Sequence, residues 1–96
     1  MGRRTKTGQK KHDQGVLRSA EYYRKQGYQV KADLPGMEQP ESINRRRPDL
    51  IAKKGREEII LEVETKNTID SDKSQHQAFK KYADKSKNRK FRIKKV

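Results

Sequence analysis

Apolar and polar residues alternate along the middle of the chain, as they do in a half-buried β-strand. The clearest run is residues 59–66, whose side chains divide between two faces. One face holds Leu61, Val63 and Thr65, and the other holds Glu62, Glu64 and Lys66. The run before it predicts a second strand that begins at Asp49, and the turn between the two contains Gly55. A hairpin-like return through this turn would bring Asp49 beside Glu62.

Helical spacing replaces alternation earlier in the chain. From about Asp13 to Gln26, apolar positions recur three and four residues apart, and Gly27 follows where a left-handed residue ends a helix. The predicted inner stripe consists of His12, Val16, Ala20 and Tyr23, with Leu17 beside it. Residues 28–32 alternate and predict the first strand, which ends at the turn over residues 33–36.

A second helix and a last strand follow the central pair of strands. Residues 36–44 are mostly polar and predict a loop. The second helix is predicted from an amphipathic stripe that comprises Gln75, Ala78, Phe79, Tyr82 and Ala83. Its candidate caps are Asp70, Ser71 and Asp72, and we expect it to end near residues 86–88. Phe91 and Ile93 alternate in a short final strand, so the predicted class is α/β with the order α-β-β-β-α-β.

Positive charge dominates the composition. The 96 residues carry 26 Lys and Arg against 13 Asp and Glu, a formal charge of +13, which favours a polyanionic partner such as nucleic acid. Residues 1–11 contain no acid, so we expect a flexible basic arm that contacts phosphates, followed by a single domain over residues 12–96. The basic residues of this arm include Arg3, Arg4, Lys10 and Lys11. Only 28% of the residues are hydrophobic, so the core must be thin.

Several other classes of function are disfavoured. No apolar run approaches the length of a membrane span, and Trp, which anchors interfacial helices, is absent. A chain without cysteine has neither a disulfide framework nor a thiolate zinc site. The basic N-terminus lacks the apolar region of a signal peptide, so we expect a cytoplasmic protein that associates with nucleic acid.

Three carboxylates, those of Asp49, Glu62 and Glu64, are predicted to gather at one sheet edge of this basic chain. Oxygen ligands of this kind suit a hard divalent cation, Mg²⁺ or Mn²⁺, which can neutralise a phosphodiester and activate water. Without the cation the carboxylates would repel one another, and at least one pKa would be raised. The run that comprises Arg45, Arg46 and Arg47 is placed to hold phosphate. The alternative is a solvated strand face with cross-strand pairs of Glu and Lys.

Pro48-Asp49, followed by Glu62-Val63-Glu64 thirteen residues after Asp49, resembles the motif of the PD-(D/E)xK nuclease superfamily. The order of elements from His12 onward is also similar, and within the superfamily the chain looks most like archaeal Holliday-junction resolvases and small restriction-endonuclease-like proteins. The resemblance implies a restriction-endonuclease-like core with a mixed sheet flanked by helices. It also implies a Mg²⁺- or Mn²⁺-dependent endonuclease that hydrolyses DNA phosphodiester bonds, branched and recombination-intermediate DNA included.

The same resemblance implies roles for the site residues, with one departure. When Asp49 and Glu62 are aligned on the motif, the family's lysine falls on Glu64; in the other register, Lys66 fills that position. We expect Asp49 and Glu62 to hold the metal and Glu64 to join them or to orient water. Lys66 would contact the phosphate or lower the pKa of the water.

The sequence also gives an expected role for each of Gln75 and His12. In the resembled family, a glutamine at the start of the second helix faces the active site, and the alternative is that Gln75 caps or lines the helix end. His12 lies where resolvase-like relatives often place an acid on the first helix, and we count it among the residues that contact nucleic acid. A lone histidine is more often structural, which is the alternative for His12.

Two other functions stay open beside the nuclease. The first is a non-catalytic, basic nucleic-acid-binding module, either an inactivated nuclease fold or an RNA-associated protein. The second is a domain of a larger enzyme, because the sequence stops directly after its last predicted strand. Similarity to the resolvases favours a homodimer, because a four-way junction offers paired scission sites.

Overall fold

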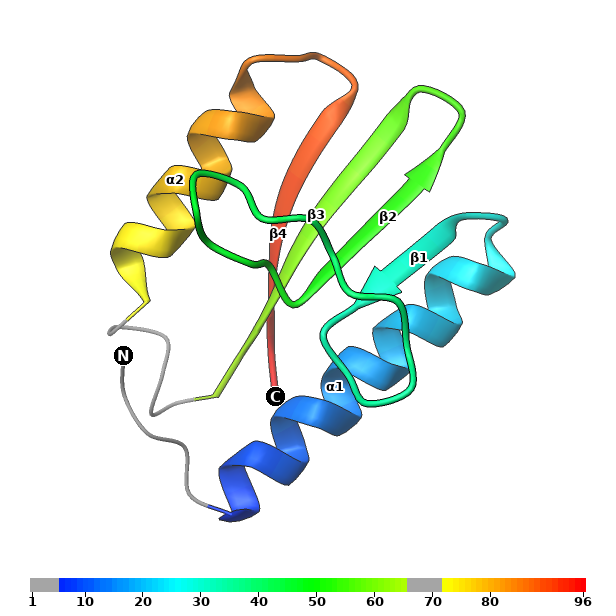
Figure 1. Cartoon of the computed structure of the whole chain (residues 1–96), viewed down its shortest axis with the longest axis vertical. Coiled ribbons are helices and arrows are strands. Elements are labelled where there is room, and N and C mark those ends of the chain that lie inside the picture. Colours follow the sequence, from blue (N-terminus) through cyan, green and yellow to red (C-terminus); the bar gives the residue numbers. More distant parts are fainter. Residues whose placement is uncertain (1–5, 66–71) are drawn as a thin grey trace.

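A computed structural model describes residues 6–65 and 72–96 of the chain. Two helices flank a four-stranded sheet in the predicted order α-β-β-β-α-β, which confirms the α/β class (Figure 1). The elements are α1 (Lys6–Lys25), β1 (Gln29–Ala32), β2 (Leu50–Lys54), β3 (Glu57–Glu64), α2 (Lys73–Asp84) and β4 (Arg89–Lys95).

The sheet is mixed, and its register positions the residues of interest. The strand order is β1-β2-β3-β4. Strand β2 pairs antiparallel with both β1 and β3, and β4 pairs parallel with β3. Leu50 pairs with Leu61 across the β2–β3 hairpin, whose turn contains Gly55 at φ +58°. Because an antiparallel register continues residue by residue, Asp49 lies opposite Glu62, as the hairpin prediction required.

Alternation along β3 divides the core into two layers. Ile59, Leu61 and Val63 pack with Val16 and other residues of α1 on one face of the sheet. On the other face, Ile60 packs with Phe79 and Ala83 of α2. The next two residues of that second face are Glu62 and Glu64, so α2 covers the acidic end of the strand as well as its apolar part.

The first helix differs from its prediction at its start and on one face. Helix α1 begins at Lys6, seven residues before the predicted Asp13, so Lys6–Lys11 of the predicted flexible arm are helical. The prediction followed apolar periodicity, which begins only at His12, whereas Lys and Gln extend a helix without burying anything. The inner stripe from His12 to Tyr23 is buried as predicted, but Leu17 is 45% exposed and does not belong to it.

The second helix ends at Asp84, two residues before the predicted region 86–88. Of its three candidate caps, Asp70 and Ser71 lie outside the described residues, and the side chain of Asp72 makes no capping hydrogen bond.

A long connection between β1 and β2 carries the arginine run to the start of β2. Within it, Ile43 and Arg46 exchange two backbone hydrogen bonds around Asn44 and Arg45. Both central residues have positive φ, +50° and +68°, as a type I′ turn requires. Ile43 is buried in the α2-side core and anchors this turn, while Arg45 and Arg47 stay exposed and Arg46 is half-buried.

Close packing of α1 on the sheet depends on a glycine. A Cβ atom at Gly15 would lie 2.8 Å from Cγ1 of Val63 and 2.7 Å from Cγ1 of Val96. In Figure 1 the C-terminal end of β4 reaches α1 at this level. Gly15 therefore has no room for a side chain, although it lies inside a helix.

Gly15→Ala is expected to destabilise the fold by about 1–3 kcal/mol, because overpacking against the buried Val63 outweighs the higher helix propensity of alanine. Chemical denaturation measures the change. Gln14→Ala, on an exposed position of the same helix, serves as the control and should change stability by less than about 0.5 kcal/mol. A Gly15→Ala protein more stable than the wild type would contradict the packing.

Candidate metal centre

Asp49 and Glu62 meet at the end of the β2–β3 hairpin and bond to each other's strand. The backbone N–H of Asp49 donates to Oε2 of Glu62 at 2.8 Å. The backbone N–H of Val63 donates to Oδ2 of Asp49, also at 2.8 Å. These reciprocal bonds hold both carboxylates in one place, so the predicted proximity of Asp49 and Glu62 is confirmed.

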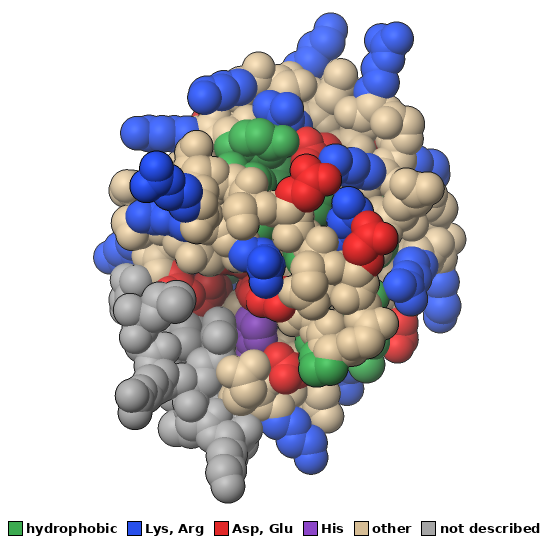
Figure 2. Space-filling model, viewed as in Figure 1, with side chains coloured by type: hydrophobic (Ala, Val, Ile, Leu, Met, Phe, Trp, Pro, Cys, Tyr) green, Lys and Arg blue, Asp and Glu red, His purple; other side chains and the backbone are tan. Residues whose placement is uncertain are grey.

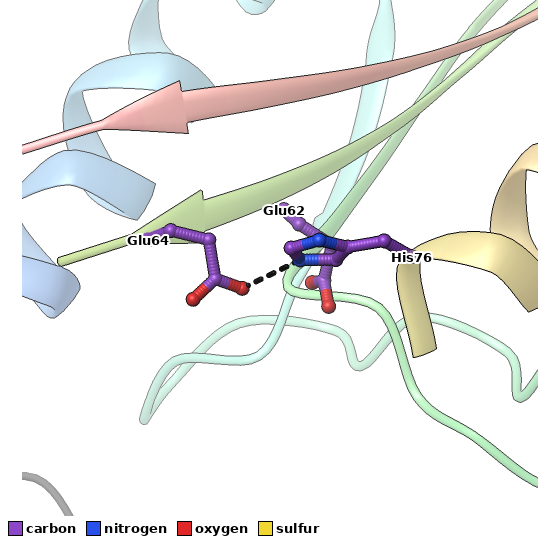
Figure 3. A group of neighbouring side chains, drawn as sticks. All are labelled: Glu62, Glu64 and His76. Atoms are coloured by element: carbon purple, nitrogen blue, oxygen red, sulfur yellow. Dashed lines mark hydrogen bonds and ion pairs between the residues drawn. The ribbon is translucent and has the colours of Figure 1, made fainter. Parts of the chain in front are cut away.

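Glu62 and Glu64 both project from β3 toward the first turn of α2, where His76 lies (Figure 3). Nε2 of His76 is 2.9 Å from Oε1 of Glu64. One ligand atom from each of Glu62, Glu64 and His76 lies within 4.8 Å of the others. Each glutamate is only 1% exposed, and carboxylates are rarely buried to this extent in proteins.

The neighbouring Gln75 supports Glu62. Its amide Nε2 donates a hydrogen bond to Oε1 of Glu62, so both carboxylate oxygens of Glu62 accept a bond, one from each side. Of the two interpretations from the sequence, the structure has Gln75 facing the acidic pocket rather than capping the helix.

His12 reaches the same pocket from α1. Its Nε2 is 3.1 Å from Oδ2 of Asp49, and its Nδ1 is 3.2 Å from Oδ1 of Asp13. At 4% exposed, His12 is buried and lies against Asp49, because the rotation of α1 about the sheet turns the imidazole inward. Its predicted contact with nucleic acid stays a prediction.

Crowding of the carboxylates shows in their pKa values. Burial, followed by the negative charge of Asp49, raises the pKa of Glu62 to about 9, despite two hydrogen bonds that favour the charged form. Burial by itself would raise the pKa of Asp49. The hydrogen bond and charge of His12, together with the hydrogen bond from the Val63 N–H, outweigh burial, so the pKa of Asp49 is lowered. The raised pKa expected for metal-free carboxylates is therefore found at Glu62.

The donor set fits a divalent cation. Two buried glutamates, an adjacent aspartate and an imidazole combine hard oxygen ligands with a nitrogen that Mn²⁺ also accepts. Burial and the negative charge of Asp49 disfavour a negative charge on Glu62. A bound cation would stabilise that charge. The residues present therefore suit the Mg²⁺ or Mn²⁺ site that the sequence predicts.

Basic residues predicted to contact nucleic acid are distributed unevenly around this centre. Figure 2 shows acidic side chains around a histidine on one face of the molecule, with Lys and Arg side chains spread about them. Lys10 and Lys11 are exposed on α1. Arg3, Arg4 and Lys66 lie outside the described residues, so their predicted roles stay predictions.

His76 is the one residue of this pocket that sequence reasoning missed among those the structure describes. A signal was present, because His76 precedes the buried Phe79 by three residues and Ala83 by seven, which places all three on the same helix face. The predicted stripe begins at Gln75 and does not include His76.

Metal-free protein is expected to lose stability as the pH rises. The folded state keeps a proton on Glu62 until about pH 9, whereas the unfolded chain releases it near its ordinary value of 4.5. Each pH unit between these values therefore costs up to about 1.4 kcal/mol. Thermal unfolding in chelator from pH 5 to pH 8 measures this loss, and Glu62→Gln should largely remove it. A wild-type melting temperature that does not fall would contradict a protonated Glu62.

Comparison with known proteins agrees with the fold. Within the part of the chain that the structure describes, neither helix has the length and apolar character needed to cross a membrane. No curated protein and no solved structure matches the chain. A family model described as REase_AHJR-like matches residues 4–95. The chain therefore belongs to the REase_AHJR-like family, the restriction-endonuclease-like and archaeal Holliday-junction-resolvase-like nucleases of the PD-(D/E)xK superfamily.

Proposed function

We propose that this protein is a metal-dependent endonuclease that hydrolyses phosphodiester bonds in DNA. The observation that carries the proposal is the buried group of Glu62, Glu64 and His76, with Asp49 hydrogen-bonded beside Glu62. Glu62 accepts a hydrogen bond from the amide of Gln75, and Oε1 of Glu64 lies 2.9 Å from the imidazole of His76. Membership of a nuclease family makes nucleic acid the substrate class.

Asp49 and Glu62 would hold a Mg²⁺ or Mn²⁺ ion, with Glu64 and His76 as further donors. The ion, when bound, would neutralise the charge of the phosphodiester and lower the pKa of a water molecule. The protein keeps the ligands in place beforehand, because each is fixed by a second contact. Gln75 fixes Glu62, and His12 fixes Asp49.

As an alternative to holding the ion, Glu64 and His76 would act on protons. Their hydrogen bond of 2.9 Å lets the pair accept a proton from the attacking water and share it between Oε1 and Nε2. In the register that aligns Asp49 and Glu62 on the motif, Glu64 stands where the family has lysine. Lys66 remains our candidate for a direct contact with the phosphate.

Surrounding cations would bring the substrate to this acidic pocket. Exposed Arg45 and Arg47 precede Asp49, which lies directly before β2, and exposed Lys10 and Lys11 precede His12 on α1. Arg3 and Arg4 would add phosphate contacts from the N-terminal arm. We also propose that the DNA substrate is branched and that the protein acts as a homodimer.

An inactivated nuclease fold that only binds nucleic acid is the second candidate. It is favoured by the register that aligns Asp49 and Glu62 on the motif, because Glu64 then stands where the family has lysine; in the other register Lys66 fills that position. Both candidates predict binding that weakens with salt, so cleavage alone separates them.

Asp49→Asn is expected to reduce cleavage about a thousandfold or more, because metal binding supplies several kcal/mol of transition-state stabilisation. The assay incubates linear, single-stranded and four-way-junction DNA with Mg²⁺ or Mn²⁺, with a parallel series in chelator. Binding measured in chelator should persist in the variant.

Asp84→Asn makes the same chemical change at an exposed position at the end of α2 and should leave cleavage unchanged. If wild-type protein with metal leaves every DNA shape intact, the inactivated-nuclease alternative replaces the enzymatic proposal.

His76→Ala is expected to weaken Mn²⁺ binding about 10- to 100-fold, because it removes both a donor and the partner that orients Glu64. Calorimetric titration with Mn²⁺ measures the affinity. Gln77→Ala, the exposed next residue of α2, is the matched control. Equal Mn²⁺ affinity in wild type and His76→Ala would remove the histidine from the centre.

A further inference from the structure

Helix α1 leaves one side of the edge strand β4 uncovered. The helix packs mainly on β1, β2 and β3. The parallel register places Lys90, Arg92 and Lys94 beside Ile59, Leu61 and Val63, on the α1 side of the sheet. Lys90 and Arg92 are exposed and Lys94 is half-buried, so β4 presents a row of cations next to the helix.

Two hollows follow the seam between α1 and β4. One, of about 400 Å³, lies near the C-terminal end of α1 and is lined by Tyr22, Lys90 and Arg92 among others. The second, of about 320 Å³, lies farther along β4 and is lined by Arg18 and Lys94 among others. Two side-chain contacts lie along the seam: Arg92 to Oη of Tyr23 at 3.5 Å, and Lys94 to Oγ of Ser19 at 3.4 Å. We call the seam with its two hollows the α1/β4 groove.

Charge in the α1/β4 groove is strongly unbalanced. Four cations line each hollow, while the carboxylates among the described lining residues are Glu57 and Glu58, both in the first hollow. Glu57 accepts a hydrogen bond from the hydroxyl of Tyr28 at 2.7 Å, and Glu58 is paired with Arg89 at 3.1 Å. The remaining positive charge faces solvent and is complementary to a polyanion.

Aromatic rings at one end of the groove narrow the choice of polyanion. Tyr22 is 58% exposed, and its ring is held edge-on by Tyr23 with centroids 5.2 Å apart. An exposed, braced ring beside a row of cations is the arrangement that holds unpaired bases by stacking while the cations follow the backbone. In a duplex the base faces are stacked inside and could not reach Tyr22.

We propose that the α1/β4 groove is a binding site for single-stranded nucleic acid, with phosphates along Lys90, Arg92 and Lys94 and a base stacked on Tyr22. The groove lies on the α1 side of the sheet, whereas Glu62 and Glu64 face α2. A strand held in the groove is therefore a different segment from the one at the acidic pocket. The proposal takes nucleic acid as the substrate class and does not depend on cleavage.

The test compares two triple variants of equal charge for binding to a labelled oligothymidylate of about ten nucleotides, in chelator, by fluorescence anisotropy. K90Q/R92Q/K94Q removes the groove cations, and K80Q/K81Q/K85Q removes three exposed cations on or next to α2. The groove variant should bind about tenfold or more weakly, and its slope of log affinity against log salt should fall by about 2, at about 0.7 for each lost phosphate contact. The α2 variant should stay within about twofold of the wild type. Equal losses in both variants would overturn the site.

Tyr22→Ala tests the stacking contact, and its exposed position leaves the fold intact. It should weaken binding of the single strand about fivefold or more while leaving affinity for a duplex of the same length unchanged. Unchanged single-strand affinity, or an equal loss for the duplex, would overturn the assignment to single strands. Asp49→Asn should keep full binding in the groove, so failure of the nuclease proposal and failure of this one give different results.

Discussion

Two carboxylates that share one buried pocket impose the main physical constraint on this molecule. The register of the β2–β3 hairpin places Asp49 opposite Glu62, and each accepts a backbone N–H from the other's strand. The hydrogen bonds favour a negative charge on both carboxylates. Burial and mutual repulsion oppose this, so the pKa of Asp49 is lowered and that of Glu62 is raised. Two things could relieve this conflict: a proton retained on Glu62, whose pKa is raised by burial and by the charge of Asp49, or a bound cation.

The acidic pocket takes its rigidity from the strand that also builds the core. Within β3, Ile60 packs against Phe79, and the next residues on the same face are Glu62 and Glu64. Helix α2 is likewise shared, since Phe79 anchors it and His76 lies one turn earlier on the same side. The thin core therefore holds the ligand atoms in place directly, without an intervening loop.

Charge is arranged at two scales. The chain as a whole is strongly positive, which attracts a polyanion from a distance, while the pocket is locally negative and would reject a phosphate without a cation. Opposite sides of the sheet carry these features, because β4 turns its lysines and arginine toward α1 and β3 turns its glutamates toward α2. A mixed sheet in a small domain can thereby keep an acidic pocket and a predominantly basic groove apart.

The sequence by itself determined the order of the elements, the two-face division of β3 and the approach of Asp49 to Glu62. These features depend on the alternation of apolar and polar side chains along a strand and on a short hairpin turn. Both are local patterns that span about fifteen residues or fewer. Only the tertiary structure decided that His76 bonds to Glu64, that His12 turns inward to Asp49 and that Leu17 stays exposed. Those features depend on how each helix is rotated against the sheet. That rotation is set by the joint packing of many side chains, such as the contact of Gly15 with Val63, and no local pattern encodes it.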